Sequence, residues 1–213
     1  MKLSPLRRRT AAFLWLSLPV VAIGGWFYPY LGYLVIPCMI APIIVGIFKG
    51  RHWCGWFCPR GAFFDFIMRH FTPNRTAPPW IRSKAFRTGV LIFLMGMMTV
   101  QISMVWPDGR AIGRVFVLLL GVTTVVGIGL AVTFKPRTWC TFCPMGTMAN
   151  WVSHGKRPLV VSEECKECAA CAKDCPMDLT PYEGGSAHAD CLKCNQCVLK
   201  CPLDALSFQE SGD

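Results

Sequence analysis

Eight of the thirteen cysteines fall into two copies of one pattern near the C-terminus. Residues 165–176 read CKECAACAKDCP and residues 191–202 read CLKCNQCVLKCP, each a Cys-x2-Cys-x2-Cys-x3-Cys-Pro run. In such runs the first three thiolates bind one [4Fe-4S] cluster and the fourth binds the neighbouring cluster. The pattern therefore predicts two [4Fe-4S] clusters, one held by Cys165, Cys168, Cys171 and Cys201, the other by Cys191, Cys194, Cys197 and Cys175. The alternative, a pair of zinc knuckles, would need four ligands per knuckle, usually split by a longer loop.

Four more cysteines lie in two segments that resemble each other. Residues 49–65 read KGRHWCGWFCPRGAFFD and residues 135–150 read KPRTWCTFCPMGTMAN, and both contain a basic residue, Trp-Cys, Phe-Cys-Pro and Gly. Four thiolates are the usual complement of an iron–sulfur cluster or of zinc. If the two segments meet, Cys54, Cys58, Cys140 and Cys143 form a third centre. The alternative treats the aromatic residues as an interfacial belt and these cysteines as small apolar packing residues.

Long uncharged runs must position these motifs. The chain is 53% hydrophobic and 16% charged, which is typical of a membrane protein. No charged residue occurs between Ala11 and Phe48, a run long enough for a helix of roughly 57 Å, so it must turn back within WFYPYLGYL. Thr88–Trp106 and Val115–Phe134 are two further uncharged runs, joined through Pro-Asp-Gly. We predict four transmembrane helices arranged as two tandem hairpins, each followed by one Cys-Pro segment.

The N-terminus has a second interpretation. LRRRTAAFLWL has the basic start and apolar continuation of a cleaved signal. The apolar run is too long for a signal and lacks a clear cleavage site, so we expect a retained anchor.

Charge predicts the orientation. Residues 1–162 contain 18 Lys/Arg against two acidic residues, whereas residues 163–213 contain four Lys against ten acidic residues. The positive residues bracket apolar runs and do not form one folded face, so we expect no nucleic acid partner. The positive-inside rule places both termini in the cytoplasm, where iron–sulfur clusters are kept reduced. We expect a multi-pass protein of the bacterial inner membrane.

The predicted fold is an all-α membrane domain (residues 1–155) followed by a small α+β two-cluster ferredoxin domain (residues 156–213). This arrangement resembles the membrane ferredoxin subunits of the NapH family and the membrane regions of NosR-type and CcoG-type proteins. Cys54-x3-Cys58-Pro59 has the family's spacing, whereas Cys140-x2-Cys143-Pro144 is one residue shorter. The chain has no Cys-x-x-Cys-His motif, so covalent c-type haem is not supported.

The resemblance implies an electron-transfer subunit of the quinol dehydrogenase type, working between the quinol/quinone pool and redox partners of a respiratory complex. The alternative is an assembly factor or copper reductase that supplies electrons to a maturing enzyme. Ionisable groups near the first Cys-Pro segment are candidates for proton transfer with quinol, or simply face water: His52, Asp65, Arg69 and His70. In that interpretation Gly61–Phe71 is an interfacial helix with Phe63, Phe64, Phe66 and Ile67 towards lipid. We expect Cys38 to be a packing residue within its helix and His154 to bind no haem.

Overall fold

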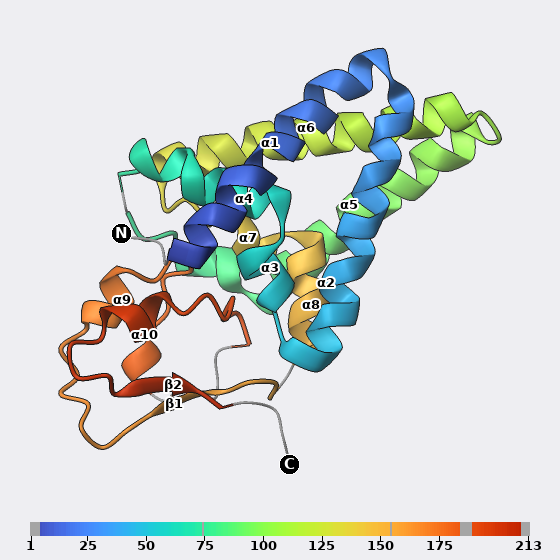
Figure 1. Cartoon of the computed structure of the whole chain (residues 1–213). Coiled ribbons are helices and arrows are strands. Elements are labelled where there is room, and N and C mark those ends of the chain that lie inside the picture. The colour runs from blue at the N-terminus through green and yellow to red at the C-terminus, as the bar shows by residue number, and fades with distance from the viewer. Residues whose placement is uncertain (1–4, 74, 154, 184–188, 210–213) are drawn as a thin grey trace.

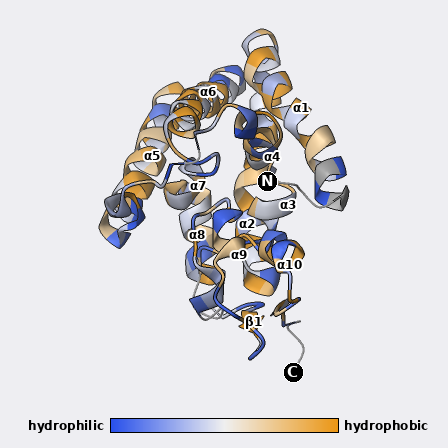
Figure 2. Ribbon diagram, turned by 90° about the vertical axis from the view of Figure 1, so that its left-hand side faces the viewer, coloured by the Kyte–Doolittle hydropathy of each residue, from blue (hydrophilic) through white to orange (hydrophobic). Residues whose placement is uncertain are grey.

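The computed structural model describes residues 5–73, 75–153, 155–183 and 189–209. Within this part of the chain, four helical segments are long and apolar enough to cross a membrane. They comprise Arg9–Phe27, Pro29–Lys49, Lys84–Val105 and Gly109–Thr133. The helices concerned are α1 (Pro5–Phe27), α2 (Val35–Lys49), α5 (Lys84–Val105) and α6 (Gly109–Thr133). Hydrophobic residues run along these helices, and many of their side chains are exposed, as expected for contact with lipid (Figure 2).

Each hairpin turns where the sequence places its turn residues. In the first hairpin, a short 3₁₀ helix, η1 (Pro29–Leu34), joins α1 to α2. In the turn between α5 and α6, Asp108 caps the N-terminus of α6 by accepting a hydrogen bond from the Arg110 N–H. The hydroxyl of Tyr33 donates to the carbonyl of Gly109 at 3.0 Å, so the two turns contact each other. Both lie at the end of the molecule away from the C-terminal segment (Figure 1). The chain therefore returns to the same end after each hairpin.

Short helices follow each hairpin and form a compact layer between the long helices and the C-terminal segment (Figure 1). After the first hairpin come α3 (His52–Trp56), α4 (Pro59–Phe66), η2 (Met68–His70) and η3 (Pro79–Arg82); after the second come α7 (Trp139–Phe142) and α8 (Pro144–Val152). Both α4 and α8 begin at the proline of a Cys-Pro pair, because a proline at the first helical position loses no helical hydrogen bond. Helix α4 packs on α1 and α8 packs on α5, while α2 contacts α8 and α6 contacts α4. The tandem repeat in the sequence is thus also a repeat in packing.

The core of this layer is aromatic and aliphatic. It consists of Phe64, Met68, Ile81, Ala131, Trp139 and Phe142. Phe64 comes from α4 of the first repeat and Trp139 from α7 of the second, so burying them ties the two halves together.

The C-terminal segment, called here the tail (residues 156–183 and 189–209), contains little regular structure. Strands β1 (Leu159–Val161) and β2 (Leu206–Phe208) pair antiparallel, with Leu159 opposite Phe208. Between them lie α9 (Ala170–Lys173), η4 (Pro181–Glu183) and α10 (Gln196–Lys200). Ala169 and Asn195, at equivalent places in the two cysteine runs, both adopt left-handed backbone angles just before a short helix. The two runs therefore fold alike.

Candidate metal centres

The four cysteines of the Cys-Pro segments line one cavity of about 420 Å³. Its size is within the range of small-molecule and cofactor sites. The walls beyond the thiols are mostly apolar and include side chains from all four long helices, with Val21, Pro42, Met95 and Leu120 as examples. The structure therefore brings together Cys54, Cys58, Cys140 and Cys143 at a place that opens towards the membrane-spanning helices. Cys38, expected to be a packing residue, also lines this cavity.

Local structure explains how the second cysteine of each pair is presented. Cys58 and Cys143 are the N-cap residues of α4 and α8. A helix N-terminus offers unpaired backbone N–H groups and a positive dipole end, which favour a thiolate. Both α3 and α7 contribute two residues after the first cysteine, and the extra residue of the first spacing is Phe57, which lies between the end of α3 and Cys58. The different spacings therefore still place both cysteines at the same position relative to the following helix.

Burial makes these thiols poor acids in the absence of a cation. It raises the pKa of Cys58 to about 12, and it raises the pKa of Cys54 and Cys140 despite the nearby Arg51 and Arg137. Metal ligation requires the thiolate, so binding here would release protons and would be favoured by the positive surroundings. The donor set and the cavity fit a metal centre with several thiolate ligands.

Each repeat contains a buried arginine whose side chain binds the backbone of the other repeat. Arg51 lies three residues before Cys54, yet it donates to the carbonyl of Cys140 at 2.8 Å. Arg137 lies three residues before Cys140, and it donates to the carbonyl of Cys54 at 2.7 Å, with a further contact to Cys140 Sγ at 3.9 Å. Both arginine side chains are only 1% exposed. Each repeat thus fixes the cysteine backbone of the other.

A glycine at the start of each following helix makes room for the partner's arginine. A Cβ atom at Gly61 would lie 2.8 Å from Cζ of Arg137, and one at Gly146 would lie 2.6 Å from an Nη atom of Arg51. Both distances are shorter than side chains tolerate. The Cys-Pro-x-Gly pattern is therefore explained by the space that the guanidinium groups need.

One carboxylate completes each arginine pair. Asp65 accepts from Nε and Nη2 of Arg137 at 2.9 and 2.6 Å and is also paired with Arg7; we call these three residues the first frame. All three are about 1% exposed. Burial would raise the pKa of Asp65, but the ion pairs with Arg137 and Arg7 outweigh it and hold the pKa below its usual value. The first frame is thus a buried charge cluster that links α1, α4 and the second repeat.

The second frame consists of Arg51, Arg87 and Asp190. Asp190 accepts from Arg87 at 2.7 and 2.5 Å and from Arg51 at 3.1 Å. Burial opposes ionisation of Asp190, but hydrogen bonding from Arg87 and the charge of Arg51 lower its pKa. This carboxylate comes from the tail, one residue before Cys191.

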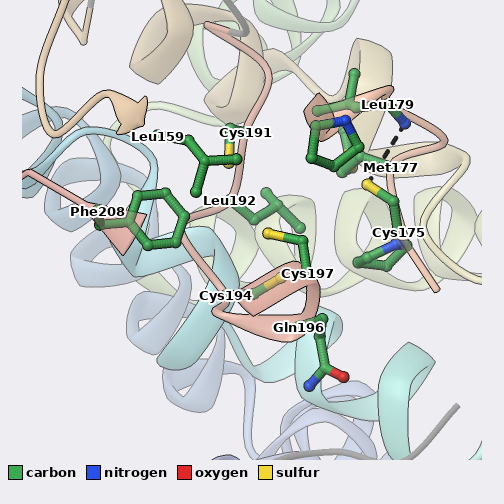
Figure 3. Close-up of a pocket in the computed structure, with 12 residues that line it drawn as sticks. Leu159, Cys175, Met177, Leu179, Cys191, Leu192, Cys194, Gln196, Cys197 and Phe208 are labelled. Carbon is green, nitrogen blue, oxygen red and sulfur yellow. Dashed lines mark hydrogen bonds between the residues drawn. The ribbon is translucent and has the colours of Figure 1, made fainter. Parts of the chain in front are cut away.

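In the tail, the four cysteines predicted to hold the second cluster line a single cavity. Cys191, Cys194 and Cys197 lie along one stretch of chain, and Cys175 approaches from another (Figure 3). The Leu179 N–H donates to Cys175 Sγ at 3.4 Å, and Leu159, Met177 and Phe208 shield the cavity. The cross-motif arrangement that the spacing predicts is therefore the one that the structure brings together.

The other predicted set is more open. Cys168 is exposed, Cys165 is half-buried and Cys171 is buried. Cys171 lies close enough to Cys165 and Cys168 for their charges to interact, and Cys201 packs against the same small core as Cys171. Cys197 belongs to that core as well, so the two tail sets are neighbours.

The tail sets and the membrane set are also in contact. Cys54 and Cys140 pack in one apolar cluster with Met177, Leu192 and Cys194. The membrane set therefore shares one apolar cluster with the second tail set, and the second tail set shares another with the first. None of the thirteen cysteines forms a disulfide. Among the described residues, no three His, Cys, Asp or Glu side chains are arranged to hold a single metal ion.

Several expectations about the first Cys-Pro segment are wrong. Asp65 does not face water, because two arginines bury and pair it, and Phe64 does not face lipid, because it is fully buried against the second repeat. His52 stacks on Trp56, and burial together with the charges of Arg157 and Lys49 lowers its pKa to about 4. His70 is exposed. His154 lies outside the described residues.

Sequence reasoning missed the roles of Arg51, Arg137 and Asp190. The two arginines were counted as membrane-flanking charge, although each stands three residues before the first cysteine of its repeat. Aligning the repeats would have identified both the arginines and the glycines. Nothing in the sequence points to Asp190, because its arginine partners are 103 and 139 positions away.

Comparisons with known proteins agree with this picture of the site. A family model described as a 4Fe-4S binding domain matches residues 31–84 and 115–161. The matched segments contain the two membrane Cys-Pro motifs and exclude both tail cysteine runs. The similarity therefore supports iron–sulfur binding at the segments for which the sequence left two interpretations.

Three curated proteins are similar to parts of the chain. Two are uncharacterized proteins of Methanocaldococcus jannaschii. One is 24% identical over 68% of this chain and 66% of its own length, and the other is 26% identical over 66% of this chain and 57% of its own length. The third is YccM of Escherichia coli K12, named as a candidate electron transport protein, 24% identical over 66% of this chain and 45% of the relative. The chain spans about half to two thirds of the length of these relatives. No solved structure matches the chain significantly.

Proposed function

We propose that the protein is a membrane-bound iron–sulfur electron carrier that exchanges electrons between the quinol/quinone pool and a redox partner. The 4Fe-4S family model and the similarity to YccM support the electron-transfer role. When bound, the clusters would supply one-electron transfer, with the eight tail cysteines as ligands of two and the four membrane cysteines as ligands of a third.

One observation carries the quinol part of the proposal. The cavity that contains the four membrane thiols extends between the spanning helices, and its walls there are almost wholly apolar. A lipid-soluble redox molecule is the kind of substrate that such a wall accommodates, whereas a hydrated ion would lose its water without compensation. Arg60, which donates to Thr123 Oγ1 at 2.9 Å, is a polar group on this wall that can also donate a hydrogen bond to a carbonyl oxygen.

The tail would face the redox partner. It carries the more exposed cysteine set, with Cys168 at the surface. The positive residues at this end of the helices support a cytoplasmic location for the tail in a bacterial inner membrane.

The test uses the whole protein, purified anaerobically in lipid nanodiscs. Quinol analogues are added, and bleaching of the visible iron–sulfur absorption is followed. We expect reduction by at least one quinol. The substitution Leu120→Trp fills the cavity. Val125→Trp places the same large side chain on the same helix, at a position where the native side chain is 69% exposed.

Quinol-dependent bleaching should be lost in Leu120→Trp and kept in Val125→Trp, while dithionite should bleach both. Bleaching that is equal in both variants would reject the cavity as the quinol route. If no quinol reduces the protein but Cu(II) reoxidises it after dithionite, the metal reductase alternative replaces this proposal.

A further inference from the structure

The two frames are equivalent in the repeat but are completed differently. Asp65 follows Cys58 by seven residues, and the residue seven after Cys143 is Asn150. In the first frame the carboxylate belongs to the membrane part, whereas in the second that position holds a neutral amide. Arg51 and Arg87 would then share a buried region without a negative charge from their own part of the chain, which is costly.

The tail provides the missing charge. Asp190 Oδ1 accepts a hydrogen bond from Asn150 Nδ2 at 2.5 Å, and the carboxylate forms the three bonds to Arg87 and Arg51 described above. Arg51 also holds the Cys140 carbonyl, so one guanidinium joins a membrane ligand segment to the residue before Cys191.

The loop that follows Asp190 is fitted to the first repeat. Trp56 Nε1 donates to the Lys193 carbonyl at 3.0 Å. The carbonyl of Leu192 lies so close to Gly55 that any side chain there would collide with it. Leu192 and Lys193 are buried in this contact. Residues 192 and 193 therefore pack directly on α3, and Asp190, just before this loop, belongs to the second frame.

We infer that Asp190 is a positioning residue: it replaces the carboxylate that the second repeat lacks and thereby fixes the Cys191–Cys197 loop against the membrane cysteines. The inference rests on the proposed electron-transfer role for its purpose, since the separation between the two ligand sets governs electron exchange. The neutral Asn150 is part of the same device, because an aspartate there would satisfy the arginines within the membrane part and would repel Asp190.

The experiment compares the iron-loaded protein with Asp190→Asn, Asn150→Asp and the exchange variant that combines both substitutions. Asp178→Asn is the matched control, because Asp178 is also a tail carboxylate near a cluster ligand, paired with Lys135 at 2.7 Å, but it contacts neither frame. Two readouts are used: magnetic interaction between the reduced centres in the electron paramagnetic resonance spectrum, and hydrogen exchange of the amides in residues 190–196.

We expect loss of the magnetic interaction and at least tenfold faster exchange in both single frame variants, with both readouts restored in the exchange variant. Asp178→Asn should keep the magnetic interaction. Unchanged readouts in Asn150→Asp, which removes nothing from the tail, would overturn the inference. So would an exchange variant that retains iron but stays uncoupled. If Asp190→Asn fails to retain iron, Asn150→Asp and the exchange variant decide.

These readouts need no quinol. If no quinol reduces the protein but the frame variants behave as expected, the proposed function is rejected and the role of Asp190 stands. If quinol reduces the protein but the frame variants leave both readouts unchanged, the role of Asp190 is rejected and the proposed function stands.

Discussion

Replacing Asp65 by asparagine should strongly destabilise the protein, because it leaves two buried arginines without their counter-charge. Asp65, Arg7 and Arg137 are each about 1% exposed, so water cannot compensate for the lost carboxylate. Removing one partner from a buried ion pair costs about 3–5 kcal/mol. The first frame has two such pairs on a single carboxylate, so we expect a loss in the upper part of this range.

The assay is denaturant unfolding in detergent micelles, followed by tryptophan fluorescence, since Trp139 lies in the core of the same layer. Asp108→Asn is the matched control. Asp108 is exposed and caps α6, and asparagine caps a helix about as well as aspartate, so the free energy of unfolding should not change.

Arg137→Lys tests the geometry separately from the charge. Lysine keeps the positive charge but cannot make two parallel bonds to Asp65 and also reach the Cys54 carbonyl. It should therefore destabilise the protein, and it should alter the spectrum of the membrane centre.

A loss below about 1 kcal/mol for Asp65→Asn would refute the argument, because that is the cost expected at a solvent-exposed pair.

Three further outcomes follow from the same geometry. Cys140→Ser should lower the iron content from about twelve to about eight per chain, whereas Cys38→Ser should leave it unchanged; equal iron in both would return the membrane cysteines to a packing role. Gly55→Ala should loosen the tail and speed its hydrogen exchange, because the new methyl group meets the Leu192 carbonyl of the tail. Gly89→Ala, whose methyl group projects into open space, should stabilise the helix by about 0.5–1 kcal/mol. The pKa of Asp65 is lowered in the folded protein, so its stabilisation is present above the ordinary aspartate pKa of about 3.9 and is lost as the pH falls through the lower folded value. Midpoints of unfolding measured from pH 7 to pH 2 should show this loss in the wild type, and the same acid dependence in Asp65→Asn would contradict the assignment.

The sequence by itself determined the long helices and which four tail cysteines share a cavity. Uncharged runs and their turn residues predict four long apolar helices in two hairpins, and the helices and turns lie where these signals occur, because burial in lipid requires long apolar segments whose backbone is hydrogen-bonded internally. The spacing in the tail also predicts which four cysteines share a cavity, since short runs between ligands allow only a few geometries. The ligation itself stays a prediction.

Tertiary structure alone decided how the charged groups are used. From the sequence of its segment, Asp65 is expected to face solvent. Only the packing of α1 and the second repeat against α4 buries its carboxylate between two arginines. Asp190 is one of ten acidic residues between positions 163 and 213, and its role depends on arginine partners more than a hundred positions away. Local propensity carries no information about such pairs, because an ion pair becomes strong only when folding removes both charges from water.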